Sequence, residues 1–229
     1  MKVAIHQPNF APWMGYFYKM ARCSSFYYFD NAEYTKSSFI RRVLIHKGSM
    51  GELAYIRVPL INHSDYAKIN QLQIVQSTKW QQRIVAQIHQ AYHKAPYYQQ
   101  LEELISKFFI EEPESYNLSD YNIAIIEYIR KLLNIDISTN LVSRLNIQSK
   151  KTDAVLDIIK SANGTEYISG NGAKKYHDAE KFEIYNIQLN YPDFPSYFDK
   201  LMIPNHFKYA SILSYLAHYS IDEIRGFLA

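Results

Sequence analysis

The sequence has little of what marks several large classes of protein. Its single cysteine, Cys23, excludes an internal disulfide and favours a reducing compartment. No stretch approaches the roughly 20 apolar residues that a membrane-spanning helix needs. The apolar run after Lys2 is only three residues long, which is too short for a secretory signal. We therefore expect a soluble, cytoplasmic protein in which Cys23 is a small core residue rather than a nucleophile.

An excess of charge of either sign is also missing. The formal net charge is only +3, and no concentrated basic patch of the kind that binds nucleic acid is visible. Basic residues occur instead in local pairs, at Arg41-Arg42, Lys150-Lys151 and Lys174-Lys175. Most such pairs lie in solvent, although paired cations also suit contact with phosphate groups. The charge pattern argues against a nucleic-acid protein and leaves phosphate contacts open.

Glycine is scarce, whereas aromatic residues are abundant. The chain has 7 glycines against 21 tyrosines and 12 phenylalanines. Tyrosine rings pack while their hydroxyls stay hydrogen-bonded, so they suit polar pockets, broad interfaces or a core with hydrated edges. Because 48% of its 229 residues are hydrophobic, the chain can bury a sizeable core.

Short apolar runs alternate with amphipathic stretches along the chain. The expected strands cover residues 2–6, 25–30, 39–46, 52–59, 69–75, 140–145, 166–169 and 182–191, with a hairpin loop over 47–51. The expected helices cover 13–22, 80–93, 97–109, 121–133, 151–162 and 208–219, with Ser119-Asp120 as an N-cap. This alternation predicts an α/β fold, with a mostly parallel, Rossmann-like sheet and helices on both faces. We expect one domain over residues 1–229, in which residues 79–134 form a helical insertion or cap.

The most informative segment is the polar turn after the first expected strand. The apolar run Val3–Ile5 opens into His6, Gln7, Pro8 and Asn9 before a helix begins. In α/β proteins, ligands bind where a strand opens into a helix in this way. A histidine there can serve as general base, general acid or hydrogen-bond donor to a phosphate, and the two amide side chains can donate and accept hydrogen bonds. The alternative is a structural turn whose polar groups bond to the backbone.

Asp30 ends the second expected strand. If the first two strands pair, Asp30 lies near His6, because the carboxyl ends of parallel strands meet at one edge of the sheet. A carboxylate beside an imidazole orients the ring and raises its basicity. The alternative is an aspartate that caps the next turn.

A loop of small residues follows the expected strand at 166–169. The segment Ser169-Gly-Asn-Gly172 suits close approach of the backbone to a phosphate or carboxylate. It matches neither a Walker sequence nor a dinucleotide fingerprint, and it lacks the elbow of a serine hydrolase. His89 and His93 have metal-ligand spacing on an expected helix, but no third ligand is evident, so no metal site is predicted.

Taken in chain order, these segments resemble the WbqC-like family. The resemblance rests on His6–Tyr16, Phe29-Asp30, Arg41-Arg42, the Tyr97 region after Lys94-Ala-Pro96, Tyr167–Gly170 with Gly172 and Tyr176, and part of Ala210–Leu213. It spans nearly the whole chain, and the opening His-Gln-Pro-Asn element is its most specific part. The chain departs from the family at Ser214, where an acidic residue is usual, and at Ser220, where glycine is frequent.

The resemblance implies a cytoplasmic enzyme that acts on nucleotide-linked sugars. The family occurs in bacterial O-antigen and surface-polysaccharide gene clusters, and glycine transfer to an amino sugar has been suggested for its members. We therefore expect a transferase that places an aminoacyl group, such as glycyl, on the amine of a nucleotide-linked amino sugar. His6 is the expected general base and Asp30 its orienting partner. The expected substrate-binding residues are Gln7, Asn9, Tyr16, Arg41, Arg42, Ser169, Gly170, Gly172 and Tyr176.

Several points stay open at this level. No cofactor is predicted, and the acyl donor is a free amino acid with ATP, a carrier-protein thioester or an aminoacyl-tRNA. One alternative function is a non-catalytic protein that binds nucleotide sugars or glycans. Another is a nucleotidyltransferase-like enzyme that uses Mg²⁺ and a nucleoside triphosphate. The opening turn is loosely similar to that of nucleotidyltransferases, but it lacks their His-x-Gly-His element.

Overall fold

A five-stranded parallel sheet forms the centre of the computed structural model, which describes residues 1–47 and 51–229. Its strands are β1 (Lys2–His6), β2 (Ser25–Tyr28), β5 (Ser138–Leu141), β6 (Glu166–Ile168) and β7 (Gln188–Asn190). They lie in the order β5-β2-β1-β6-β7, and every neighbouring pair is parallel. Counted along the chain, this is the 3-2-1-4-5 order of a Rossmann-like sheet, so the predicted α/β class is confirmed. The hairpin loop predicted over 47–51 falls mainly on residues outside those described.

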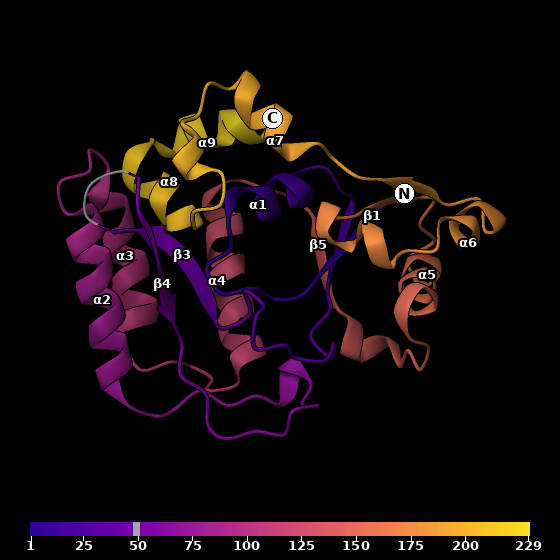
Figure 1. Cartoon of the computed structure of the whole chain (residues 1–229), viewed down its shortest axis with the longest axis horizontal. Helices are drawn as coiled ribbons and strands as arrows, with labels where there is room; N and C mark the ends of the chain where they lie inside the picture. Colours follow the sequence, from indigo (N-terminus) through magenta and orange to yellow (C-terminus); the bar gives the residue numbers. More distant parts are fainter. Residues whose placement is uncertain (48–50) are drawn as a thin grey trace.

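Helices cover both faces of this sheet (Figure 1). On one face, Val3 and Ile5 pack in a cluster with residues of α5 (Lys151–Ser161) and α6 (Ala179–Ile184). On the other face, Ala4 belongs to the larger core together with residues of α1 (Met14–Ala21) and α4 (Leu118–Leu132). Because β1 is buried on both faces, its three central residues are all apolar, as in a parallel sheet covered by helices.

A second layer surrounds the face that α4 covers. The antiparallel hairpin of β3 (Arg42–His46) and β4 (Leu53–Arg57) precedes the helical middle of the chain. The helices of this layer are α2 (Thr78–Tyr92), α3 (Glu102–Ile105), α7 (Phe194–Lys200), α8 (Ile212–His218) and α9 (Ile221–Leu228). Among the described residues, no helix has both the length and the apolar character needed to cross a bilayer.

Some expected elements differ in kind from those observed. Residues 69–75 form a 3₁₀ turn at Ile69–Gln71 and isolated bridges instead of a strand. The expected strand at 182–191 is divided, because α6 continues to Ile184 and only Gln188–Asn190 joins the sheet. The expected helix at 97–109 consists of a 3₁₀ turn, α3 and a π-helical segment. Asn117, rather than Ser119-Asp120, caps α4.

Buried hydrogen bonds hold the turn that follows β1. Asn122 of α4 donates from Nδ2 to the carbonyl oxygens of Pro8, at 2.8 Å, and Ile40, at 2.7 Å. Ser211 donates to the carbonyl of Ala11, which has a φ of 36°, and the Ile212 amide donates to the carbonyl of Pro12. The opening turn is thus fixed by residues from two distant segments, so its irregular backbone is kept despite the strain at Ala11.

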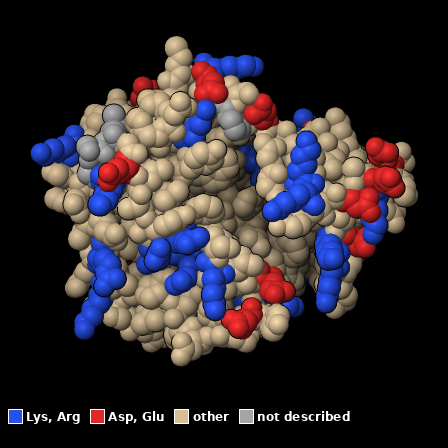
Figure 2. Space-filling view, in the orientation of Figure 1, with Lys and Arg blue, Asp and Glu red and all other residues tan. Residues whose placement is uncertain are grey.

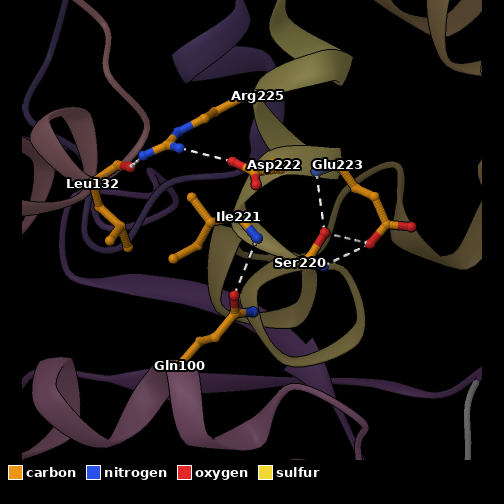
Figure 3. A network of polar contacts seen from close by, with 7 residues as sticks. All are labelled: Gln100, Leu132, Ser220, Ile221, Asp222, Glu223 and Arg225. Atoms are coloured by element: carbon orange, nitrogen blue, oxygen red, sulfur yellow. Dashed lines mark hydrogen bonds and ion pairs between the residues drawn. The ribbon is translucent and has the colours of Figure 1, made fainter.

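The departure at Ser220 has a structural role at the start of α9 (Figure 3). Ser220 and Glu223 form a capping box, in which the serine hydroxyl accepts from the Glu223 amide at 3.2 Å. The Gln100 side chain accepts from the Ile221 amide, and Arg225 donates to the Leu132 carbonyl. These contacts join the C-terminal helix to the helical middle of the chain.

Candidate functional site

The carboxyl ends of β1 and β6 meet at the point where the strand order of the sheet reverses. Ala4 pairs with Ile168, so His6 and Ser169 leave adjacent strands at the same edge. Ligands of open α/β sheets bind in the crevice at this point. Figure 2 shows a hollow between the part of the molecule formed by α5 and α6 and the larger remaining part, with Lys and Arg side chains on both sides of it. The opening turn and the Ser169–Gly172 loop, which the sequence proposed as site elements, are therefore neighbours.

His6 is a neutral imidazole with a defined tautomer. Its Nδ1 lies 3.0 Å from the Gln7 carbonyl oxygen, which can only accept, so Nδ1 carries the proton and Nε2 keeps a lone pair. Its ring packs against that of Tyr16, with centroids 4.7 Å apart. Burial, followed by the charge of Lys19, lowers the pKa of His6 to about 3. So low a pKa makes His6 a weak base, which argues against the general-base role expected from the sequence.

Lys19 is a site residue that the sequence interpretation missed. It lies on α1, is only 5% exposed, and donates from Nζ to the Ile5 carbonyl at 2.9 Å. Burial lowers the pKa of Lys19 to about 7. Burial, followed by the charge of Lys19, lowers the pKa of His177. The available signal was a lysine at i+3 from Tyr16, on the apolar face of an amphipathic helix. A lysine of this pKa can hold or release a proton near neutral pH.

Asp30 does not orient His6, although β1 and β2 do pair as expected. Its carboxylate accepts from the Ser143 amide at 2.9 Å and from Asn70 Nδ2 at 3.5 Å. No hydrogen bond joins Asp30 to His6 in the described part of the chain. The Ser143 amide lies in the turn after β5 and donates to Asp30, which follows β2. The Asp30 side chain therefore connects the ends of β2 and β5.

The opposite side of the site is formed after β6. Ser169 is buried, and its hydroxyl lies 3.4 Å from the Gly170 carbonyl. A Cβ added at Gly170 or Gly172 would meet nothing within 4 Å, so packing within the protein does not explain these glycines. Tyr176 is 68% exposed. His177 follows it and lies 2.8 Å, by Nδ1, from the Tyr191 hydroxyl after β7, a pair that the sequence did not reveal.

The remaining expected binding residues lie around the opening turn and the hairpin. The Tyr16 hydroxyl donates to the Gln7 carbonyl at 3.2 Å, so it faces the turn. Arg42 donates to the Ser37 carbonyl and stacks over the Tyr55 ring. Arg41 directly follows Ile40. The Asn122 side chain donates to the carbonyls of both Ile40 and Pro8, so the start of the hairpin lies next to the opening turn. Asn9 borders a pocket of about 240 Å³.

A second buried polar cluster explains the departure at Ser214. The Ser214 hydroxyl lies 2.5 Å from that of Tyr92, and the ring of His46 packs against those of His206 and His218. Both ring nitrogens of His46 are buried without a partner, and burial lowers its pKa to about 4. Within residues 1–47 and 51–229, no group of three His, Cys, Asp or Glu side chains is arranged to hold a metal ion.

Acidification should therefore destabilise the fold. The folded-state pKa values of His6 and His46, about 3 and about 4, lie below the ordinary value of 6.5, so the unfolded state binds more protons between these limits. Stability is fully present above pH 6.5 and falls as the pH drops toward 4, by about 1.4 kcal/mol per group per pH unit. Urea unfolding midpoints at pH 7.5, 6 and 5 measure this slope, which His46→Leu should reduce. Equal midpoints at all three pH values would contradict it.

Comparisons with known proteins agree with the resemblance seen in the opening turn. An uncharacterized protein of Mycobacterium tuberculosis, Rv1507c, is 30% identical over 201 residues, which cover 86% of this chain and 84% of that protein. No solved structure matches the chain. The profile of the WbqC-like protein family matches residues 7–226, which include Gln7, Lys19 and the Ser169–Gly172 loop. The chain therefore belongs to the WbqC-like protein family.

Proposed function

We propose that this protein transfers an aminoacyl group to the amine of a nucleotide-linked amino sugar during the assembly of a bacterial surface polysaccharide. The observation that carries the proposal is a buried lysine with a pKa of about 7 beside a neutral histidine, at the reversal point of the sheet. Acyl transfer to an amine needs a base that works near neutral pH. The family's occurrence in polysaccharide gene clusters supplies the substrate class.

In the proposed reaction, the sugar amine attacks the carbonyl carbon of the acyl donor. A C–N bond forms, the bond from that carbon to its oxygen or sulfur leaving group breaks, and the proton lost by the amine passes to neutral Lys19, which then gives it to the departing oxygen or sulfur. His6 accepts a hydrogen bond from the amine through Nε2 and so orients it. The Gln7 side-chain amide donates to the oxyanion that forms on the carbonyl. The donor is an aminoacyl ester on a tRNA, a thioester on a carrier protein, or the activated acyl group formed from a free amino acid and ATP.

Positive charge for the substrate's diphosphate comes from the hairpin. Arg41 and Arg42 each keep a buried Nε without a partner. A guanidinium with unused donors is well suited to phosphate oxygens. Arg42 already donates to the Ser37 carbonyl and stacks over Tyr55, so we assign Arg41 to the diphosphate. We assign the Gly170–Gly172 segment, which has open space in front of it, to the sugar.

The test is product formation from defined donors. Purified protein is incubated with a uridine-diphosphate amino sugar and glycyl thioester, glycyl-tRNA, or glycine with Mg²⁺-ATP, and amide products are detected by mass spectrometry. We expect His6→Ala to lower kcat about tenfold, the effect of losing one orienting hydrogen bond of about 1.4 kcal/mol. His63→Ala, in an exposed loop, is the matched control. If the protein binds the nucleotide sugar but forms no product with any donor, it is a non-catalytic binding protein instead.

A nucleotidyltransferase-like reaction is a second candidate, favoured by the 3-2-1-4-5 strand order of nucleotide-binding sheets. Tyr16 stands where such enzymes carry a histidine, and its hydroxyl is directed to the Gln7 carbonyl rather than outward. This reaction would release pyrophosphate from a nucleoside triphosphate and a sugar phosphate. Pyrophosphate release in the presence of Mg²⁺ therefore distinguishes it from aminoacyl transfer.

A further inference from the structure

A pocket beside the opening turn has features that the transfer chemistry does not use. It is lined by Asn9, Pro12, Trp13, Phe39, Val43 and Tyr209, and its volume is about 240 Å³. We propose that this pocket binds the base of a nucleoside diphosphate, with Arg41 holding the phosphates. The assignment rests on the proposed function only in taking a nucleotide-linked sugar as the substrate.

Asn9 is the polar group of the pocket. Its side chain is 6% exposed and makes no hydrogen bond to any residue that the structure describes, although it borders the pocket. Its amide atoms are not among the polar atoms that are both buried and unpartnered, so they reach the open space of the pocket, where a ligand can pair with them. A carboxamide offers one donor and one acceptor side by side, which matches the edge of a nucleobase.

Aromatic rings form the walls. The rings of Trp13 and Tyr209 have centroids 6.4 Å apart and planes 32° apart, and Phe39 borders the same space. A flat ring between them needs about 3.4 Å on each side, the stacking distance of bases. Tyr209 is 61% exposed, so a small rotation of its ring completes the gap. Aromatic faces on either side of the pocket suit the stacking of a planar base.

The indole of Trp13 is held in place by its neighbours. A Cβ at Gly15 would lie 2.5 Å from the Trp13 ring, so the indole lies directly across this glycine. The Phe194 ring contacts the indole edge to face, with centroids 4.7 Å apart. A glycine inside a helix costs about 1 kcal/mol relative to alanine. Glycine at position 15 therefore lowers the stability of α1 but leaves room for the Trp13 indole, which forms one wall of the pocket.

Arg41 lies on the side of the hairpin that faces the pocket. Its carbonyl accepts from the Val58 amide, so strand pairing continues one residue before β3 begins. Residues two apart in a strand share a face, which puts Arg41 with Val43, a lining residue, and Arg42 on the other face. The Nε of Arg41 has no partner. A base in the pocket thus leaves its phosphates next to an unused guanidinium.

The test is equilibrium binding of UDP and ADP, measured by calorimetry and by quenching of Trp13 fluorescence. The second tryptophan, Trp80, is buried and does not line the pocket. We expect Tyr209→Ala and Arg41→Gln each to raise Kd about tenfold, as loss of base stacking or a phosphate contact does. Tyr66→Ala, at an 82% exposed tyrosine, and Arg57→Gln, opposite Arg42 in the hairpin, should leave Kd unchanged.

Three results would overturn the assignment. They are no binding of either nucleotide at millimolar concentration, equal Kd values in wild type and Tyr209→Ala, or quenching by N-acetylglucosamine but not by UDP. A negative result in this binding test can be distinguished from a negative result in the product assay. Tight binding of UDP without product rejects aminoacyl transfer and keeps the pocket, whereas product with an unaltered Kd in Tyr209→Ala rejects the pocket alone.

Discussion

Replacing Lys19 by methionine should make the protein more stable and less active at once. The folded-state pKa of about 7 lies below the ordinary 10.5, so between these values the unfolded state binds more protons and wild-type stability rises with pH. Methionine removes the cost of burying the charge but also the hydrogen bond to Ile5, so we expect a net gain of about 2–4 kcal/mol at pH 7. The same change should lower kcat about 100-fold or more, because the proposed proton acceptor is lost.

Urea unfolding at pH 7 and pH 10 measures the stability half of this result. The advantage of Lys19→Met should shrink toward pH 10.5, where the wild-type side chain is neutral in both states. Lys131→Met, at an exposed lysine at the end of α4, is the matched control and should change neither quantity. A destabilised Lys19→Met variant would show that the ammonium contributes to the fold, and full activity would remove Lys19 from the mechanism.

Replacing Asn122 by alanine should have the largest destabilising effect of any single polar change near the site. Its two donors are the hydrogen-bond partners of the Pro8 and Ile40 carbonyls, and its side chain is fully buried. Two buried carbonyls left unpaired cost about 1–3 kcal/mol each. The unpartnered Oδ1 of Asn122 disappears in the same change and offsets part of that cost. We expect a net loss of about 2–5 kcal/mol in the free energy of unfolding.

The measurement is the urea midpoint at constant m-value, which separates a loss of stability from a change in compactness. Asn62→Ala, at an exposed asparagine, is the matched control and should shift the midpoint little. Asn122→Asp tests the cause, since a carboxylate cannot donate and should be at least as harmful as alanine. A tolerated Asn122→Asp would mean that the Pro8 and Ile40 carbonyls do not need these hydrogen bonds.

The elements that local pattern determines were predictable from the sequence. The central strand Lys2–His6 has a continuous apolar run, the helices around 80–93 and 151–162 have a clear apolar period, and the structure confirms all three. The stretch 182–191 has no single period, since Phe182 is buried from a helix whereas Leu189 lies in a strand. Its division into α6 and β7 depends on packing against the sheet rather than on the local sequence.

The adjacency of the two segments expected to form the site was predictable, but the contacts of their side chains were not. The opening turn and the Ser169–Gly172 loop meet as adjacent strands require. The orientation of a side chain depends on which hydrogen-bond partners lie around it. The Asp30 carboxylate accepts from the Ser143 amide, so it does not bond to His6. Lys19 was hidden because a lysine in an amphipathic helix usually lies in solvent. The burial of its side chain, which the structure shows, is what makes it a candidate site residue.

The contacts of the opening turn also determine when the site can form during synthesis. The last strand of the sheet is complete at Asn190, yet Ala11 and Pro12 receive their hydrogen bonds from Ser211 and Ile212, some 200 residues later in the chain. Contacts of such sequence separation form late in folding. A chain that stops short of Ser211 therefore contains every strand of the sheet but lacks the hydrogen-bond donors of Ala11 and Pro12, so the opening turn is incomplete until the C-terminal helices have been made.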